Sequence, residues 1–219
     1  MLEIIILALG TSWASGINLY AALTVLGVST AMGFLTLPET LLFLSHSHVI
    51  AAVILMYVFE FFADKIPGVD TIWDTLHTYI RIPAGGLMAL GILGGLDVGL
   101  DQQVQSIGAF LAGSVVTSVA HSVKAGLRAI INTSPEPVTN WAASFLEDIL
   151  VIVGMFFAIF KPIICLSILC AFALTTLWSI PKIWPGIRKV AANSLHPVRT
   201  VKADPIERIS LSLNHDSRE

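Results

Sequence analysis

Residues 60–86, EFFADKIPGVDTIWDTLHTYIRIPAGG, decide the fold of this chain. Between two stretches apolar enough to cross a membrane, this segment carries a run of ionisable residues: Glu60, Asp64, Lys65, Asp70, Asp74, His77 and Arg81. Ionisable side chains are rare inside a bilayer, and those that occur there usually face a shared interior or a pathway. A second polar stretch follows at residues 121–148. We therefore expect these two segments to build the functional site.

The composition is typical of an integral membrane protein. Hydrophobic residues make up 55% of the chain and charged residues only 12%, with a mean hydropathy of +0.83, whereas soluble proteins carry about a quarter charged residues. The sequence contains no phosphate-binding loop, nucleophile elbow or zinc-protease helix. We expect no nucleic acid partner and no cofactor.

Apolar segments of about 20 residues predict an all-α, polytopic transmembrane bundle. The six predicted spans cover residues 2–35, 47–64, 71–97, 107–131, 137–160 and 163–180. The first is interrupted by GTSWASGIN at residues 10–18, which favours a broken or tilted helix. Pro181 and Pro185 are expected to stop the last span. The transmembrane domain would then cover residues 1–181, followed by a basic, partly disordered tail over residues 182–219.

The distribution of basic residues predicts the orientation. The tail carries most of the Lys and Arg residues, so the positive-inside rule puts it in the cytoplasm. Counting back through six spans puts Lys65, Arg81, Lys124 and Arg128 on the same side and both termini in the cytoplasm. The third segment complicates this count, because only about 14 residues follow Pro83. Either its helix begins near Asp70 and carries polar residues into the membrane, or the segment is re-entrant.

A shift of 68 positions aligns the two polar segments. Pro67, Thr71 and Trp73 fall on Pro135, Thr139 and Trp141, so residues 47–97 and 107–160 each form a helical hairpin with a Pro-containing break. Matching interruptions in two halves indicate a transporter-type binding site. With the predicted orientation the repeat would be parallel, and an inverted repeat would need a re-entrant segment. Chance is an equal alternative, since both segments follow one hairpin pattern.

Helical spacing collects the polar residues into stripes. One helix face carries Asp70, Asp74, His77 and Arg81. A second carries His121, Lys124, Arg128 and Asn132, and a third carries Asn140, Ser144 and Glu147 (or Asp148). Stripes on four helices can all be shielded only if they face a common interior. The candidate site residues are Glu60, Asp64, Asp74, His77, Arg81, His121, Lys124, Arg128, Asn132 and Glu147.

The same residues could serve only to neutralise each other, since buried ions need partners. The expected pairs are Glu60 or Asp64 with Arg128, Asp74 with Lys124, and Glu147 with Arg81. Asp70 is expected in a turn or helix cap. Asp74-x-x-His77 resembles half of a carboxylate-bridged metal site. Cationic side chains in the same interior would repel a metal ion, so we expect no metal.

Three segments carry a family resemblance: GINLYAALTVLG, EFFADKIPGVDTIWDTLHTYIRIPAG and SVKAGLRAIINTSPEP, beginning at residues 16, 60 and 122. Together they resemble a family of uncharacterised bacterial integral membrane proteins, domain of unknown function 4126, over about residues 5–160. The resemblance implies a multi-pass protein of the bacterial inner membrane with about six helices. It implies no activity, substrate or catalytic residue.

The sequence favours a small permease or channel-like carrier over an enzyme. Lys124 and Arg128 would hold a small, anionic solute, while Glu60, Asp64 and Glu147 would balance charge or relay protons with His77 or His121. One alternative is a membrane-embedded enzyme or lipid-handling protein that acts on phosphate-bearing headgroups. Another is a non-catalytic scaffold whose tail recruits a partner. The expected partners are the lipid bilayer, the solute and a second copy of the chain in a homodimer.

Overall fold

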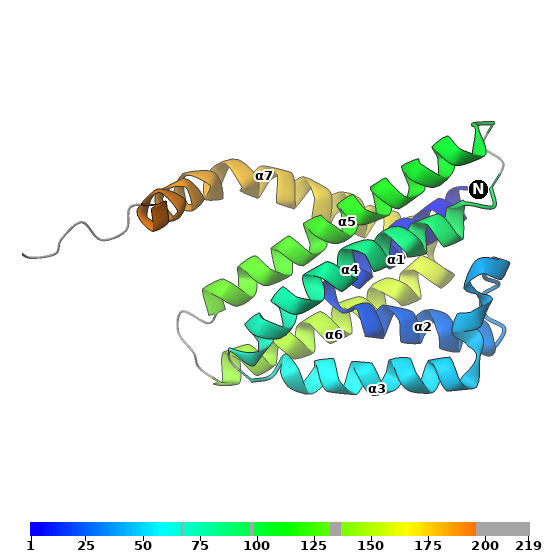
Figure 1. Cartoon of the computed structure of the whole chain (residues 1–219), viewed down its shortest axis with the longest axis horizontal. Helices are drawn as coiled ribbons and strands as arrows, with labels where there is room; N and C mark the ends of the chain where they lie inside the picture. The colour runs from blue at the N-terminus through cyan, green and yellow to red at the C-terminus, as the bar shows by residue number, and fades with distance from the viewer. Residues whose placement is uncertain (67, 97–98, 132–136, 196–219) are drawn as a thin grey trace, which may run out of the picture. The chain divides into compact units, whose positions relative to one another are not determined.

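The computed structural model describes residues 1–66, 68–96, 99–131 and 137–195. Within these ranges the regular elements are all helices, so the predicted all-α bundle is confirmed (Figure 1). The helices are α1 (Leu2–Ile17), α2 (Leu19–Ala31), the 3-10 helix η1 (Glu39–Ser45), α3 (Ser47–Ala63), α4 (Val69–Leu93), α5 (Gln102–Ile131), α6 (Pro137–Phe160) and α7 (Pro162–Leu195). The chain divides into two compact units, Met1–Phe172 and Ala173–Glu219, and the site lies in the first.

Within the described ranges, four helices are long and apolar enough to cross a membrane: α4, α5, α6 from Val138, and the first half of α7 from Pro162 to Ser179. η1 and α3 form a fifth candidate if the pair, bent by 70°, counts as one span. Large apolar side chains such as Leu76, Ile130 and Leu146 are exposed on the outer faces. The length, composition and apolar exterior of these helices indicate a membrane protein.

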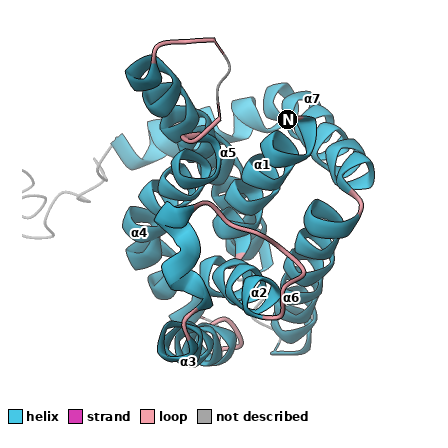
Figure 2. Ribbon diagram, turned by 90° about the vertical axis from the view of Figure 1, so that its right-hand side faces the viewer, coloured by secondary structure: helices cyan, strands magenta, loops and turns pink. Residues whose placement is uncertain are grey.

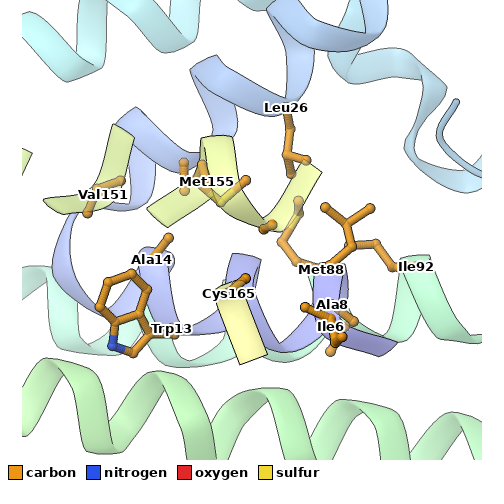
Figure 3. Packing of buried hydrophobic residues seen from close by; sticks show 14 of the residues in the cluster. Ile6, Ala8, Trp13, Ala14, Leu26, Met88, Ile92, Val151, Met155 and Cys165 are labelled. Carbon is orange, nitrogen blue, oxygen red and sulfur yellow. The ribbon is translucent and has the colours of Figure 1, made fainter. Parts of the chain in front are cut away.

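The first expected span, residues 2–35, is two helices that fold back on each other. Ile6 near the start of α1 packs in the core with Ile92 at the end of α4 (Figure 3), whereas Ile17 at the end of α1 lies against Lys124 of α5. α2 then returns to the end from which α1 began, and a Cβ on its Gly27 would lie 2.5 Å from the Leu44 carbonyl of η1 (Figure 1). The prediction that this segment crosses the membrane once, as a broken or tilted helix, did not include this fold-back. The count of six spans stays a prediction.

Asn18 makes the break between α1 and α2. Its backbone is extended, with φ of −144° and ψ of 100°, which ends α1, and its side-chain Oδ1 accepts the Ala21 N–H at 2.9 Å and caps α2. The two helices have 16 and 13 residues, or about 24 and 20 Å at 1.5 Å per residue. Each is shorter than the roughly 30 Å hydrocarbon core. The tip of this hairpin therefore lies inside the bundle.

Small residues let α1 lie directly against α4 and α5. A Cβ on Gly16 would lie 2.5 Å from the Thr117 carbonyl of α5, and one on Gly85 would lie 1.8 Å from the Thr117 hydroxyl. Ser12 of α1 donates to the Gly85 carbonyl at 3.1 Å, and Thr117 donates to the Ser12 carbonyl at 2.8 Å. Close backbone approach through Gly and Ser is typical of membrane helix packing. Figure 2 shows α1 between the α4–α5 pair and α6.

Prolines lie inside two of the helices. α4 is one continuous helix from Val69 with Pro83 inside it, so the helix that was expected to begin near Asp70 is confirmed, while the depth of its polar residues in a membrane stays a prediction. α7 continues past Pro181 and Pro185 to Leu195, so the expected stop at these prolines is wrong. Each proline removes one backbone hydrogen bond, which a long helix with intact turns on both sides tolerates. The Pro-containing breaks at residues 67 and 132–136 lie outside the described residues.

Candidate functional site

Ten charged side chains meet where α3 and α5 end and where α4 and α6 begin. We call this set the ionic cluster: Glu60, Asp64, Lys65, Asp70, Asp74, Arg81, Lys124, Arg128, Glu147 and Asp148. All are buried except Glu147, whose side chain is 16% exposed. The convergence of stripes from four helices follows the pattern expected from the sequence.

Arg81 lies at the centre of the α3–α4 side and is completely buried. Its NH2 group donates to Glu60 Oε1, and its NH1 group donates to Asp74 Oδ1 at 2.7 Å. A buried guanidinium held by two carboxylates from different helices fixes the relative positions of α3 and α4. Removing Arg81 would take away the ion-pair partner of Glu60, whereas Asp74 would keep Lys124 at 3.3 Å.

His121 extends the Arg81 contacts to α5. Its Nδ1 lies 3.3 Å from Arg81 NH1, which can only donate, so Nδ1 is the acceptor. Its Nε2 lies 2.6 Å from the Thr78 hydroxyl, which donates in turn to the Asp74 carbonyl at 2.8 Å. These contacts favour the tautomer that carries its hydrogen on Nε2.

Lys124 joins α5 to three other helices. Its Nζ donates to the Ile17 carbonyl at the end of α1 and to Asp64 Oδ2, both at 3.0 Å. The same nitrogen lies 3.3 Å from Asp74 Oδ1 and 3.5 Å from Glu147 Oε2. A cation at the last carbonyls of α1 is also favoured by the helix dipole. Lys124 thus ties the tip of the α1–α2 hairpin to the cluster.

Arg128 is bound in a forked geometry by Glu147 of α6. The Nε–Oε1 and NH2–Oε2 distances are 3.0 and 2.8 Å. NH1 donates to Asn140 Oδ1 at 2.6 Å and to the Asp64 carbonyl at 3.1 Å, and lies 3.9 Å from Asp70 Oδ2. Two parallel N–H···O bonds are the geometry in which arginine binds carboxylates and phosphates in general.

A second group surrounds the tip of the hairpin. Asn18 Nδ2 donates to Asp148 Oδ1 at 3.0 Å, and Lys65 Nζ lies 3.8 Å from Asp148 Oδ2. Lys65 also donates to Ser144 at 3.1 Å and lies 3.0 Å from the centre of the Phe61 ring. Lys65 lies two residues beyond the end of α3, and its burial lowers its pKa, an effect that the nearby Asp148 carboxylate opposes. Burial against an aromatic ring holds this ammonium in place.

The structure brings together all but two of the sequence candidates. His77 lies beside the cluster, where its ring stacks on Trp73 at 4.1 Å and its Nδ1 donates to the Trp73 carbonyl at 2.9 Å. Asn132 lies outside the described residues. The sequence did not select Lys65, Asp70, Asp148 or Asn18 as site residues. The helical stripe at Asn140, Ser144 and Asp148 was the signal for Asp148, and the GTSWASGIN interruption was the signal for Asn18.

The expected ion pairs are partly right. Asp74 pairs with Lys124, as expected. Glu147 pairs with Arg128 and Lys124 instead of Arg81, and Glu60 pairs with Arg81 instead of Arg128. Asp64 contacts Arg128 only through its backbone carbonyl, while its carboxylate pairs with Lys124. The sequence gives the face on which a side chain lies, but the depth of each helix in the bundle decides which stripe residues stand opposite each other.

Acidic groups outnumber basic ones in the cluster, six carboxylates against four. Four buried carboxylate oxygens have no hydrogen-bond partner among the described residues: Glu60 Oε2, Asp64 Oδ1, Asp74 Oδ2 and Asp148 Oδ2. A buried anionic oxygen without a partner is costly. The cluster as described is therefore incompletely neutralised.

A small cavity of about 80 Å³ reaches the cluster between α4 and α5. Asp74, His121 and Arg128 line it together with the hydroxyls of three threonines, Thr71, Thr75 and Thr78. Thr71 and Thr75 are exposed, so the cavity opens on the outer surface of the α4–α5 pair. Its volume and the polar groups in its lining suit a few water molecules. Further along the bundle, Gly86 packs on Phe110 and Gly154 packs on Trp13.

The described residues contain no group of three His, Cys, Asp or Glu side chains arranged to hold a metal ion. The model of the family described as "Domain of unknown function (DUF4126)" matches residues 5–182. The chain belongs to this family of unknown function. No curated protein and no solved structure matches the chain.

Proposed function

We propose that this family member is a small membrane permease whose transport site is the ionic cluster, described here in a closed state. The observation that carries the proposal is the tip of the α1–α2 hairpin, which meets the cluster inside the bundle through Asn18 and the Ile17 carbonyl. Helices that break near the middle of the bundle supply solute and ion sites in many carriers, because their free backbone groups and dipoles face the site.

Burial of the cluster supports the same function. Ten charged groups are held inside a chain with apolar outer faces, where hydrophobic side chains would cost less free energy. Pairing leaves a surplus of two acidic groups, and four carboxylate oxygens accept no hydrogen bond from the described residues. A site that exchanges charged ligands with water needs groups of this kind.

The solute that fits Arg128 is a small carboxylate or phosphate. Glu147 presents two oxygens to the Nε and NH2 groups of Arg128 and is the most exposed carboxylate of the cluster. A solute with a carboxylate or phosphate group would make the same two bonds in place of Glu147. Glu147 then acts as an internal competitor, which the solute displaces from Arg128.

The test uses the purified protein in proteoliposomes adsorbed on a solid-supported membrane, with a panel of small carboxylates and inorganic phosphate as probes. We expect solute-dependent currents that Arg128→Lys abolishes, because lysine keeps the charge and loses the fork. Glu147→Gln should lower the solute concentration that gives half-maximal current, because it weakens the internal competitor. Lys161→Ala, in the exposed connection between α6 and α7, serves as the control. Unchanged currents in Arg128→Lys would remove Arg128 from the mechanism.

A second candidate function has one observation in its favour. The cavity at Asp74 and Arg128 opens on the outer surface between α4 and α5, where a phospholipid headgroup could enter from the side. The same proteoliposomes, prepared with a fluorescent phospholipid and treated with a membrane-impermeant quencher, test this function. Protein-dependent movement of the lipid between leaflets, together with no current for any solute, would replace the permease with a lipid-handling protein.

A further inference from the structure

We infer that the second half of α7 is an interfacial helix, which binds anionic phospholipid headgroups at the membrane surface where the span of α7 ends. The inference goes beyond the proposed transport function. It does not depend on that function, because it concerns the end of α7 and none of the residues of the ionic cluster.

α7 is longer than the part of it that suits a membrane span. Of its 34 residues, only the 18 from Pro162 to Ser179 are apolar enough to cross a membrane, which leaves 16 helical residues up to Leu195. Sixteen residues of α-helix extend for about 24 Å. A helix of this length beyond the hydrocarbon core either projects into water or lies along the membrane surface.

The amino-acid sequence of this second half favours the membrane surface. Helical spacing collects apolar residues on one face, interrupted only by Ser194: Ile183, Trp184, Ile187, Val190, Ala191 and Leu195. The other face carries Lys182, Arg188, Lys189 and Asn193. Basic residues on one face with Trp and aliphatic residues on the other are typical of helices that lie in the membrane interface. Projection into water would instead expose the apolar face.

The charge of the segment identifies the partner as an anionic lipid surface. Residues 162–203 contain no Asp or Glu, and their basic residues are Lys182, Arg188, Lys189, Arg199 and Lys202. Basic segments next to a membrane span attract anionic phospholipids, and each Lys or Arg near the surface strengthens binding about fivefold. No acidic residue within the segment competes with the lipid phosphates for these side chains.

The junction between the two halves of α7 has the features of a membrane interface. Lys182 Nζ lies 3.1 Å from the centre of the Trp178 ring, and Trp178 is 67% exposed. Trp side chains are enriched at the level of the headgroups, and Lys extends its ammonium group toward them. Pro181 and Pro185 follow directly, where each missing backbone hydrogen bond makes bending of the helix easier. The helix can therefore turn here from the span onto the surface.

Spin labels on the reconstituted full chain test the inference. Ile187→Cys labels the apolar face and Ala192→Cys the basic face, in a chain with Cys165 and Cys170 replaced. In phosphatidylcholine vesicles that contain phosphatidylglycerol, the label at 187 should be accessible to oxygen and shielded from a water-soluble nickel complex. The label at 192 should react to the nickel complex. High salt, or vesicles without phosphatidylglycerol, should expose the label at 187, because the attraction is screened or absent.

Two pairs of charge-removing substitutions separate this helix from the rest of the tail. Arg188→Gln combined with Lys189→Gln should lower the ratio of shielded to exposed label at 187 by about 25-fold. Arg208→Gln combined with Arg218→Gln removes the same charge beyond Asp204 and serves as the matched control. The control should leave the shielding unchanged.

Three results would overturn the inference. The first is equal exposure of the two labels to the nickel complex in vesicles with phosphatidylglycerol. The second is shielding at 187 that is the same with and without phosphatidylglycerol. The third is spin–spin broadening at 187 that disappears on dilution with unlabelled protein, which would identify a second copy of the chain as the partner. None of these measurements uses a solute, so an absence of solute currents would overturn the permease and leave the lipid-binding helix standing.

Discussion

At the scale of single residues, the ionic cluster depends on shared carboxylates. Asp74 Oδ1 serves both Arg81 and Lys124, and Glu147 Oε2 serves both Lys124 and Arg128. Arg81, Lys124 and Arg128 each have more than one acidic partner. Lys65 is paired with Asp148, and four carboxylate oxygens accept no hydrogen bond from the described residues. Because acidic groups are in surplus, the loss of a basic group should lower the stability of the protein more than the loss of an acidic group.

The first prediction compares Lys124→Met with Asp64→Asn. Lys124→Met leaves buried carboxylates uncompensated and should lower the free energy of unfolding by about 3–5 kcal/mol. Asp64→Asn removes one surplus charge and keeps a polar group for Lys124, so its cost should be nearer about 1 kcal/mol. Thermal unfolding in detergent, followed by circular dichroism, measures the difference. Equal losses of stability would contradict the acidic surplus.

At the scale of the elements, the α1–α2 hairpin is held by side chains at its tip and by glycines along its length. Asn18 makes two bonds of different kinds, one to the start of α2 and one to Asp148 of α6. Gly16 of α1, and Gly85 and Gly113 of its neighbours, allow backbones to approach closely. The tip therefore determines the position of the hairpin in the site, and the glycines determine its contact with α4 and α5.

The second prediction concerns Asn18. Asn18→Ala removes the cap of α2 and leaves Asp148 without a donor, which together should cost about 2–4 kcal/mol. Asn18→Asp keeps a capping oxygen but puts a carboxylate against Asp148, so its unfolding temperature should rise as the pH falls and the repulsion is relieved. Ser118→Ala, which removes a hydroxyl bonded only within α5, is the control for thermal unfolding. A pH-independent unfolding temperature for Asn18→Asp would argue against the Asn18–Asp148 contact.

The third prediction compares two glycines five residues apart on α5. A Cβ on Gly113 would lie 2.5 Å from Ala89 Cβ and 2.7 Å from the Gly85 carbonyl, whereas a Cβ on Gly108 would meet nothing within 4 Å. Gly113→Ala should therefore lose about 1–3 kcal/mol through overpacking. Gly108→Ala should leave stability unchanged or raise it by up to about 1 kcal/mol, because alanine favours the helix. The two unfolding temperatures measure the contrast, and a tolerated Gly113→Ala would contradict the close packing of α4 and α5.

At the scale of the described bundle, the interior holds an apolar core and the ionic cluster, and large apolar side chains also cover the outer faces. Arg81 and Arg128 are among its most deeply buried side chains, while Leu76 and Tyr79 on α4 are exposed. The fold-back of α1 and α2 puts Met1 and η1 at one end of the bundle, opposite the ionic cluster (Figure 1). Six full crossings would instead put Met1 and the His46–His48 region on opposite faces of a membrane.

The fourth prediction separates these two arrangements. Single cysteines introduced by Glu3→Cys and His46→Cys, in a chain with Cys165 and Cys170 replaced, should react with a membrane-impermeant maleimide from the same side. The expected result follows from the fold-back at Asn18, since neither α1 nor α2 is long enough to span the membrane alone. An Ile66→Cys chain should be labelled from the other side. Labelling of Glu3→Cys and His46→Cys from opposite sides would contradict the fold-back.

The sequence by itself determined the apolar exterior, the helices between residues 47 and 160 and the stripes that carry the charges, because hydropathy and helical periodicity depend only on the order of residues. Helical periodicity also put Asp74 and Lys124 on faces that could meet, and they do. Only the tertiary structure decided that Arg81 pairs with Glu60 and Arg128 with Glu147. It also decided that residues 2–31 fold back at Asn18. These outcomes depend on the depth and rotation of each helix against its neighbours, which are set by close contacts such as those of Gly16 and Gly85 with Thr117. Contacts of this kind join residues far apart in the chain, and no local pattern records them.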